Sequence, residues 1–109
     1  MMDLAFYQRK AIETAIYPTE YRISYPAFGL AGEAGEVMNK IKKVYRDNQG
    51  VFDKETKKEI AKELGDVLWY LAVLSQDLGQ SLDRTAEMNL EKLSERKKRG
   101  TLAGSGDNR

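Results

Sequence analysis

The sequence contains no cysteine and no histidine in 109 residues. Without cysteine the chain forms no disulfide framework, and without either residue it forms no Cys/His zinc site. A catalytic Ser–His–Asp triad or Cys–His pair is excluded for the same reason. If the protein is an enzyme, its chemistry must come from carboxylates, lysine, arginine, tyrosine or a metal ion with oxygen ligands.

The sequence also lacks an excess of charge of one sign and a long apolar run. Its 18 basic and 17 acidic residues give a net charge of +1, so bulk charge gives no reason to expect binding to nucleic acid or membranes. No apolar segment approaches the roughly 20 residues of a membrane span, and the N-terminus has no apolar signal-peptide core. We therefore expect a cytoplasmic protein with no nucleic-acid or membrane partner.

Proline is scarce, since Pro18 and Pro26 are the only two. Long proline-free stretches rich in Ala, Leu, Glu and Lys are typical of helices, and strand signals are nearly absent. The pattern predicts four helices, over residues 3–16, 26–46, 53–78 and 81–99. Because the chain is about one domain long, we expect an all-α single domain of the four-helix bundle type.

The third predicted helix combines an apolar stripe with one central charge. At 100° per residue, six residues fall on one side and predict a core stripe: Ile60, Leu64, Val67, Leu71, Leu74 and Leu78. Asp66 is the only charged residue between Leu64 and Leu74. An isolated buried carboxylate is unfavourable unless a cation or several donors meet it, so Asp66 needs a partner. Glu63 lies one turn earlier, beside the stripe.

The second predicted helix repeats this arrangement. Its apolar stripe consists of Leu30, Ala34, Val37, Ile41 and Val44. Glu33 and Glu36 lie about a quarter turn away, and Lys40 and Lys43 continue their row. Three glycines recur near its start: Gly29, Gly32 and Gly35. Each glycine costs about 0.5–1 kcal/mol relative to alanine in a helix, which makes sense if another backbone or a ligand approaches closely.

Antiparallel packing of these two helices would bring the four carboxylates together. Hard oxygen ligands without His or Cys favour Mg²⁺ or Mn²⁺ over Zn²⁺, and Mg²⁺ commonly binds a few carboxylates together with substrate phosphates. In the competing interpretation the acids are exposed and pair with lysines one turn away: Lys40, Lys43, Lys58 and Lys62. Periodicity alone leaves both interpretations open.

Three segments of the sequence resemble the MazG-like nucleotide pyrophosphohydrolases. They are GLAGEAGEV at residues 29–37, KELGDVLWY at 62–70 and NLEKLSER at 89–96, and the similarity extends over about residues 6–109. The family is all-α and carries an E-x-x-E motif followed by an E-x-x-D motif. In this sequence the two motifs correspond to Glu33, Glu36, Glu63 and Asp66.

The resemblance implies a metal-dependent enzyme that converts a nucleoside triphosphate to a monophosphate and pyrophosphate. The four acids would hold Mg²⁺, with Mn²⁺ as an alternative, and a water activated by the metal would attack the α-phosphorus. One of the glutamates would orient that water, and the sequence does not say which. The expected substrate-binding residues are Asn89, Lys92 and Arg96 for the phosphates, Tyr70 for the base, and secondarily Lys40 and Lys43.

The sequence departs from the family pattern at two positions. Many relatives have two adjacent acids in the first motif, whereas position 32 here is glycine. Some carry a lysine one turn before the second motif, whereas this chain has Glu59 there. Glu59 is either an extra metal ligand or an exposed acid, and we expect it to be exposed.

A second apolar face on the third predicted helix indicates an oligomer. This face consists of Trp69, Ala61, Gly65 and Ala72. A single four-helix bundle does not explain it, although Trp69 alone could pack on another helix. Relatives of the MazG-like family are commonly dimers or tetramers. We therefore expect a homodimer or homotetramer.

The resemblance divides the chain into a catalytic domain, residues 1–99, and a glycine-rich tail, residues 100–109. Composition favours a flexible tail, but relatives resembling this chain end similarly, and glycines with Arg109 suit a lid over bound nucleotide. Two alternatives stay open. One is a non-catalytic helical interaction or regulatory module in which the acids are structural, and the other is a dUTP- or dCTP-directed pyrophosphatase of the same superfamily.

Overall fold

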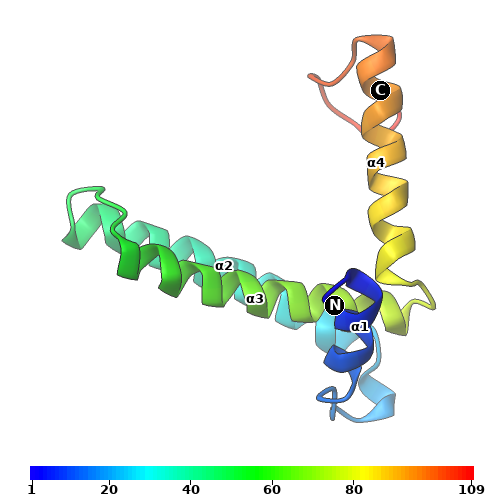
Figure 1. The fold of residues 1–109 in the computed structure, drawn as a ribbon, viewed down its shortest axis with the longest axis horizontal. Coiled ribbons are helices and arrows are strands. Elements are labelled where there is room, and N and C mark those ends of the chain that lie inside the picture. Colours follow the sequence, from blue (N-terminus) through cyan, green and yellow to red (C-terminus); the bar gives the residue numbers. More distant parts are fainter.

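The computed structural model describes residues 1–109 as four α-helices and one short 3₁₀ helix (Figure 1). Their bounds are α1 Leu4–Ile12, η1 Thr19–Tyr21, α2 Ser24–Asp47, α3 Lys54–Asp77 and α4 Leu82–Arg99. The all-α class and the four predicted helices are confirmed. The first helix is shorter than expected and ends at Ile12, and no helix combines the length and the apolarity that crossing a membrane requires.

Side-chain caps define where three of the helices begin. In each case a side-chain oxygen accepts a hydrogen bond of 2.8–3.0 Å from the backbone N–H three residues later. The capping residues are Asp3, Asp53 and Ser81. Such a bond satisfies an N–H group that has no partner within the helix. At the other end, Gly100 closes α4 in the left-handed conformation, with a φ of 72°.

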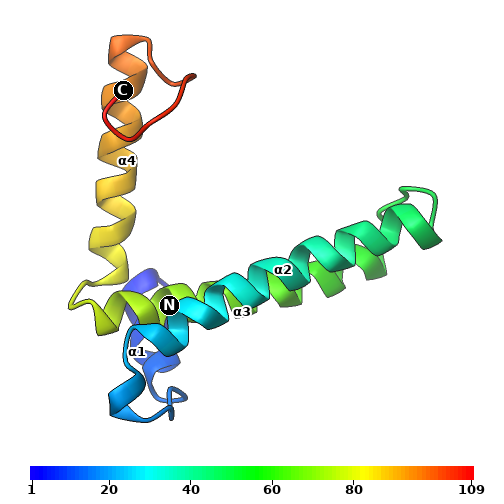
Figure 2. The same cartoon turned by 180° about the vertical axis from the view of Figure 1, so that it is seen from behind.

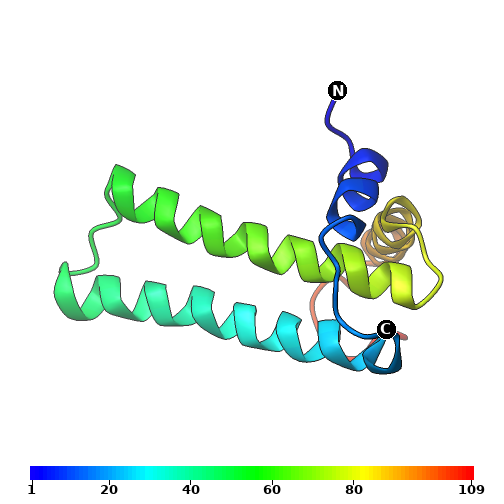
Figure 3. The same ribbon diagram turned by 90° about the horizontal axis from the view of Figure 1, so that it is seen from below.

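The long helices α2 and α3 form an antiparallel hairpin, and α4 leaves it in a different direction. Figure 3 shows α2 and α3 side by side, with the connection between them at the far end from α1. In Figures 1 and 2, α4 points away from this pair and carries the C-terminal residues with it. The radius of gyration is 16.8 Å, against about 13 Å for a compact domain of this length. The four helices therefore do not close into one compact bundle within a single chain.

The small core lies where α1, α3 and α4 meet. Its buried members are Ala11, Ala72, Val73 and Leu82. Beside them the buried Gln8 side chain donates hydrogen bonds to the carbonyls of Ala72 and Gln80, at 3.1 and 3.2 Å. Its oxygen accepts from the N–H of Leu82 at 2.9 Å. Gln8 thus fixes α1 to both the end of α3 and the start of α4.

The apolar stripe predicted for α3 is only partly buried. Leu64, Leu71 and Leu78 are 53%, 39% and 54% exposed, so the prediction that they belong to the core was wrong for one chain. Ile60, Val67 and Leu74 are partly buried, as expected. The periodicity identified the apolar side of α3 correctly. Within one chain, however, α1 and α2 pack beside this side and leave part of it exposed.

The second apolar face of α3 is divided between the interior and the surface. Ala72 is fully buried, and the indole N–H of Trp69 donates to the Thr14 hydroxyl at 2.8 Å. These two residues therefore pack within the chain, under the α1 segment. Ala61 and Gly65 are exposed. The expectation that all four residues form one free face was wrong, because the α1 segment covers half of it.

Candidate active site

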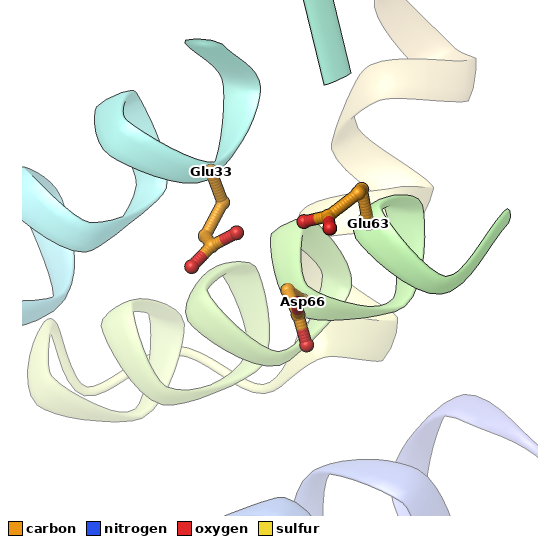
Figure 4. Close-up of side chains that lie close together, drawn as sticks. All are labelled: Glu33, Glu63 and Asp66. Carbon is orange, nitrogen blue, oxygen red and sulfur yellow. The ribbon is translucent and has the colours of Figure 1, made fainter. Parts of the chain in front are cut away.

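Three carboxylates from α2 and α3 lie together on the helical hairpin (Figure 4). One carboxylate oxygen from each of Glu33, Glu63 and Asp66 lies within 4.8 Å of the others. Glu33 projects from α2 towards the two acids on α3, which are one turn apart (Figure 4). We call these three residues the acid cluster. The antiparallel packing expected from the sequence is what brings them together, since Glu33 is 30 residues from Glu63 in the chain.

The positive charge next to the acid cluster does not balance the negative charge of its three carboxylates. Partial burial and the negative charges of Asp66 and Glu63 raise the pKa of Glu33 above its ordinary value. The cation paired with the cluster is Lys40, whose Nζ lies 3.8 Å from a carboxylate oxygen of Glu63. Three convergent carboxylates are the ligand type that Mg²⁺ and Mn²⁺ prefer, so the donor set fits a hard divalent cation.

Asp66 is exposed rather than buried. The expectation of an isolated buried charge was wrong, because the apolar residues around Asp66 in the sequence point to other sides of α3. Its carboxylate lies instead at the open edge of the acid cluster. The charge does have neighbours there, as expected, but they are two further acids rather than a protein cation.

The fourth acid of the motifs lies outside the cluster. Glu36 is exposed and lines a recess on α2 together with Gly32 and Gly35. Glu59 is also separate, since it pairs with Lys62 at 3.4 Å and its side chain is 42% exposed. The hydrogen bond and the charge of Lys62 lower the pKa of Glu59. The structure therefore brings together three of the four expected ligands, and Glu59 is not among them.

Lys40 and Lys43 lie between the acid cluster and the turn that joins α2 to α3. Both line a cavity of about 360 Å³ between the two helices. Acidic residues of the turn and of the start of α3 also line it, so the cavity is polar and of mixed charge. Lys40 contacts the acid cluster as well and thus connects the two regions.

Tyr70 packs its ring against Gly29. A Cβ atom at position 29 would lie 2.1 Å from the Cε1 atom of Tyr70, so a side chain at this position would displace the ring. A close approach does occur at Gly29, but the neighbour is a tyrosine side chain and not the backbone or ligand that we expected. Gly32 and Gly35 have no such neighbour, since nothing lies within 4 Å of a Cβ atom at either position.

The expected phosphate-binding residues lie on α4, which points away from the α2–α3 hairpin that carries the acid cluster (Figure 1). Lys92 and Arg96 instead contact the C-terminal tail, and each places a side-chain nitrogen 3.4 Å from the same Asp107 carboxylate oxygen. These two cations lower the pKa of Asp107. Asn89 is exposed on α4 without a side-chain hydrogen bond. Sequence reasoning did not single out Asp107, although it is the only acid after the basic end of α4.

Residues 101–109 fold back into a loop over Arg96. The Arg109 guanidinium donates to the carbonyls of Thr101, Leu102 and Gly106 at 3.2, 3.1 and 2.6 Å. Arg96 is only 4% exposed as a result, although α4 extends away from the other helices. Its Nη2 donates to the Asp107 carbonyl at 2.9 Å, while its buried Nε has no partner. In this arrangement the tail covers the arginine expected to bind phosphate.

Comparison with known proteins gives a matching family model and a similar phage protein. Residues 27–101 match the family model described as MazG nucleotide pyrophosphohydrolase domain. The chain is 46% identical over 114 residues to the Gene 37 protein of Mycobacterium phage L5, and the match covers 99% of this chain and 100% of that protein. No solved structure matches the chain. The acid cluster, Lys92 and Arg96 all lie within the matched family segment. Residues 102–109 of the tail lie beyond it.

Proposed function

The chain belongs to the MazG nucleotide pyrophosphohydrolase family, and we propose that it converts a nucleoside triphosphate to the monophosphate and pyrophosphate with the help of Mg²⁺. Mn²⁺ is the alternative metal. The observation that carries this proposal is the convergence of Glu33, Glu63 and Asp66 within 4.8 Å. Exposed acids that served only as partners of nearby lysines would have no reason to meet across two helices.

Different residues of the α2–α3 hairpin have different roles in the proposed reaction. When bound, the metal ion supplies positive charge against the phosphate oxygens and makes a water molecule acidic enough to attack the α-phosphorus. Glu33, Glu63 and Asp66 would hold the ion, and one of the two glutamates would accept the proton of the attacking water. Lys40, at 3.8 Å from Glu63, neutralises negative charge on the phosphates, and Lys43 lies further along the same cavity.

Glu36 completes the ligand set in this proposal. It follows Glu33 by one helical turn, and its side chain is exposed and free of hydrogen bonds. In this proposal a rotamer change turns its carboxylate towards the acid cluster. Charge repulsion from the three acids disfavours that rotamer in the absence of a cation, and a bound divalent ion removes the repulsion.

We also propose that the enzyme is a homodimer or homotetramer. Only 9 of 109 residues are buried, and the apolar side of α3 that contains Leu64 and Leu71 has no cover within the chain. Lys92 and Arg96 belong to α4, which points away from the α2–α3 hairpin that carries the acid cluster (Figure 1). A second subunit whose α4 crosses the α2–α3 hairpin would bury apolar surface and bring these cations to the bound phosphates.

The C-terminal tail acts as a lid in the same proposal. Asp107 holds Lys92 and Arg96 through one carboxylate oxygen, in the way that a phosphate group would. The loop must therefore open before either cation reaches a substrate. Its glycines permit the rearrangement, since Gly104 and Gly106 already have φ values of 110° and 86°.

The experiment that tests the activity is a substrate panel with product identification. Purified protein is incubated with each ribo- and deoxyribonucleoside triphosphate and Mg²⁺, and the products are followed by phosphorus NMR. We expect monophosphate and pyrophosphate, and no turnover after chelation of the metal. Nucleoside diphosphate and orthophosphate as main products would refute the proposed reaction. Absence of turnover with the whole panel would favour the non-catalytic module, and strict use of dUTP or dCTP would identify the narrower enzyme class.

Replacing Asp66 tests the acid cluster itself. We expect Asp66→Asn to lower kcat by more than about 100-fold, because it removes a charged metal ligand rather than an outer-shell partner. The fold should persist, since the side chain is exposed. Steady-state kinetics and thermal melting measure the two effects. Glu59→Gln is the matched control, because it neutralises an acid on the same helix outside the cluster. Wild-type activity in Asp66→Asn would exclude the assigned metal site.

A further inference from the structure

A row of aromatic residues continues the line of the acid cluster towards the start of α2. Tyr25, Gly29 and Glu33 are spaced four residues apart, so they lie on one face of α2. Tyr70, one turn after Asp66 on α3, packs over Gly29. Because the two helices are antiparallel, the order along the hairpin is Tyr25, then Tyr70, then the acid cluster, then Lys40. Tyrosines lie at one end of this row and a lysine at the other.

Tyr25 presents an aromatic ring that is supported from one side. Its ring stacks on Tyr17, with centroids 4.7 Å apart and an interplanar angle of 17°. The residue nevertheless remains 46% exposed. The stack is thus a flat aromatic surface open to solvent beside the proposed active site.

Hydrogen bonds to Asp77 hold this stack in place. The Tyr17 hydroxyl donates to the Asp77 carboxylate at 2.7 Å, and the backbone N–H of Ile23 donates to the same oxygen at 3.0 Å. Arg22 adds an ion pair at 3.6 Å, and the Asp77 side chain is only 8% exposed. The connection before Tyr25 is therefore fixed to the end of α3.

The backbone just before Tyr25 is strained. Ile23 has a φ of 70° and a ψ of −57°, and the N–H of Ser24 donates to the carbonyl of Arg22 at 2.8 Å. These values describe a γ-turn with positive φ, which is rare and unfavourable for a β-branched residue. Such conformations persist only where the surroundings over-determine them, as the bonds to Asp77 do here. The turn sets the direction from which α2 and Tyr25 begin.

We propose that Tyr25, supported by Tyr17, is the platform on which the nucleobase of the substrate stacks. This inference rests on the proposed function, and it defines how the bound nucleotide is oriented along the α2–α3 hairpin. The base lies on Tyr25, the sugar lies near Tyr70, the reacting phosphorus lies at the acid cluster, and the outer phosphates point towards Lys40 and Lys43. The eight residues from Tyr25 to Glu33 span about 12 Å of helix. Because every base has an aromatic face, the platform contributes affinity for all bases alike.

Substitutions at Tyr25 test the platform. The variants are Tyr25→Ala, which removes the ring, and Tyr25→Phe, which keeps it. Tyr21→Ala is the matched control, because Tyr21 is a 52% exposed tyrosine of the same connection with no stacked partner. We expect Tyr25→Ala to raise KM for nucleoside triphosphates about tenfold, by loss of base stacking. Tyr25→Phe and Tyr21→Ala should both stay near the wild-type value.

Inorganic tripolyphosphate, used as a competitive inhibitor, separates base binding from phosphate binding. It has no base, so its inhibition constant should be the same in wild type and Tyr25→Ala. A parallel increase for tripolyphosphate would overturn the inference, because the effect would then come from the metal or phosphate region. Unchanged KM in Tyr25→Ala would also overturn it while leaving the proposed activity intact. If Tyr25→Ala melts at a much lower temperature, Tyr25→Leu keeps the bulk of the residue without the aromatic face and takes its place. A wild-type protein that releases no pyrophosphate would overturn the proposed function and the platform with it.

Discussion

Asp77 connects the segment before α2 to the end of α3 through one carboxylate. Burial alone would raise its pKa, but hydrogen bonds from Ile23 and Tyr17 together with Arg22 lower the pKa below the ordinary value of 3.8. The same contact, after burial, raises the pKa of Tyr17 to about 12. Both shifts favour the pair of an ionised aspartate and a neutral tyrosine, which is the pair present at neutral pH.

The low pKa of Asp77 predicts a specific loss of stability in acid. A carboxylate whose pKa is depressed by folding stabilises the protein above its unfolded pKa, and this contribution disappears as the pH falls through the folded pKa. We therefore expect the free energy of unfolding to fall below about pH 3.8, more steeply in wild type than in Asp77→Asn. Urea unfolding between pH 2 and pH 7 at fixed protein concentration measures this.

At neutral pH the same variant should be less stable by about 1–3 kcal/mol, because hydrogen bonds to a charged acceptor are lost. Asp83→Asn is the control, since that aspartate is exposed and forms no ion pair. Identical pH profiles for wild type and Asp77→Asn would show that Asp77 does not contribute through its charge.

Gln8 has a corresponding role between helices, where it satisfies backbone groups of three segments. We expect Gln8→Leu to lower the free energy of unfolding by about 1–3 kcal/mol, because the Leu82 N–H is left buried without a partner and the Ala72 carbonyl loses its second donor. Gln76→Leu is the control, since Gln76 is exposed on α3 and forms no side-chain hydrogen bond. Equal denaturation midpoints for the two variants would contradict this role.

The C-terminal loop is the element whose removal tests the lid. We expect deletion of residues 101–109 to raise KM or lower kcat while the melting temperature stays the same, since the ion pairs of the loop join it to α4 and not to the core. Asp107→Asn keeps the loop but removes the negative charge that pairs with Lys92 and Arg96, so it should weaken the closed arrangement and lower KM instead. Steady-state kinetics of both variants test whether the loop acts as a lid. Parameters equal to those of the full chain in both would show that the loop has no part in turnover.

The order of the helices and most of their limits, though not the end of α1, could be predicted because their signals are local. Caps such as Asp53 and Ser81, and the glycine at position 100, lie within a few residues of the ends they define. The paired acids could be predicted for the same reason. The contacts of Gln8 and Asp77 could not, since they join residues 54–74 positions apart.

Which side of a helix is covered was the least predictable feature. Hydrophobic periodicity gives the direction of an apolar stripe but not the neighbour that covers it. Leu64 therefore looked like core, and Trp69 looked like part of a free face. The separation of Glu36 from Glu33 was hidden in the same way, because a spacing of one turn places two acids on one side of a helix without fixing their rotamers.

At the scale of the whole molecule, the open shape predicts association. We expect light scattering at micromolar concentration to give at least twice the monomer mass of 12.4 kDa. Leu64→Glu, on the uncovered side of α3, should shift the protein towards the monomer because it places a charge in the apolar contact. Lys57→Glu is the control, as Lys57 is exposed on the same helix and forms no ion pair. A mass of 12.4 kDa for the wild type would exclude a stable oligomer.

α4 is attached to the rest of the chain at one end, so a small rotation at that end moves its other end by several ångströms. Its 18 residues are about 27 Å long, and it is joined to α3 through Gly79, whose φ is 72°. A rotation of 10° at this joint would therefore move the far end of α4 by about 5 Å, enough to make or break a contact between Arg96 and a phosphate. The hydrogen bonds of Gln8 hold α4 only at its first residues, next to this joint. Small adjustments beside Gln8 are thus amplified along α4 into the position of its two cations.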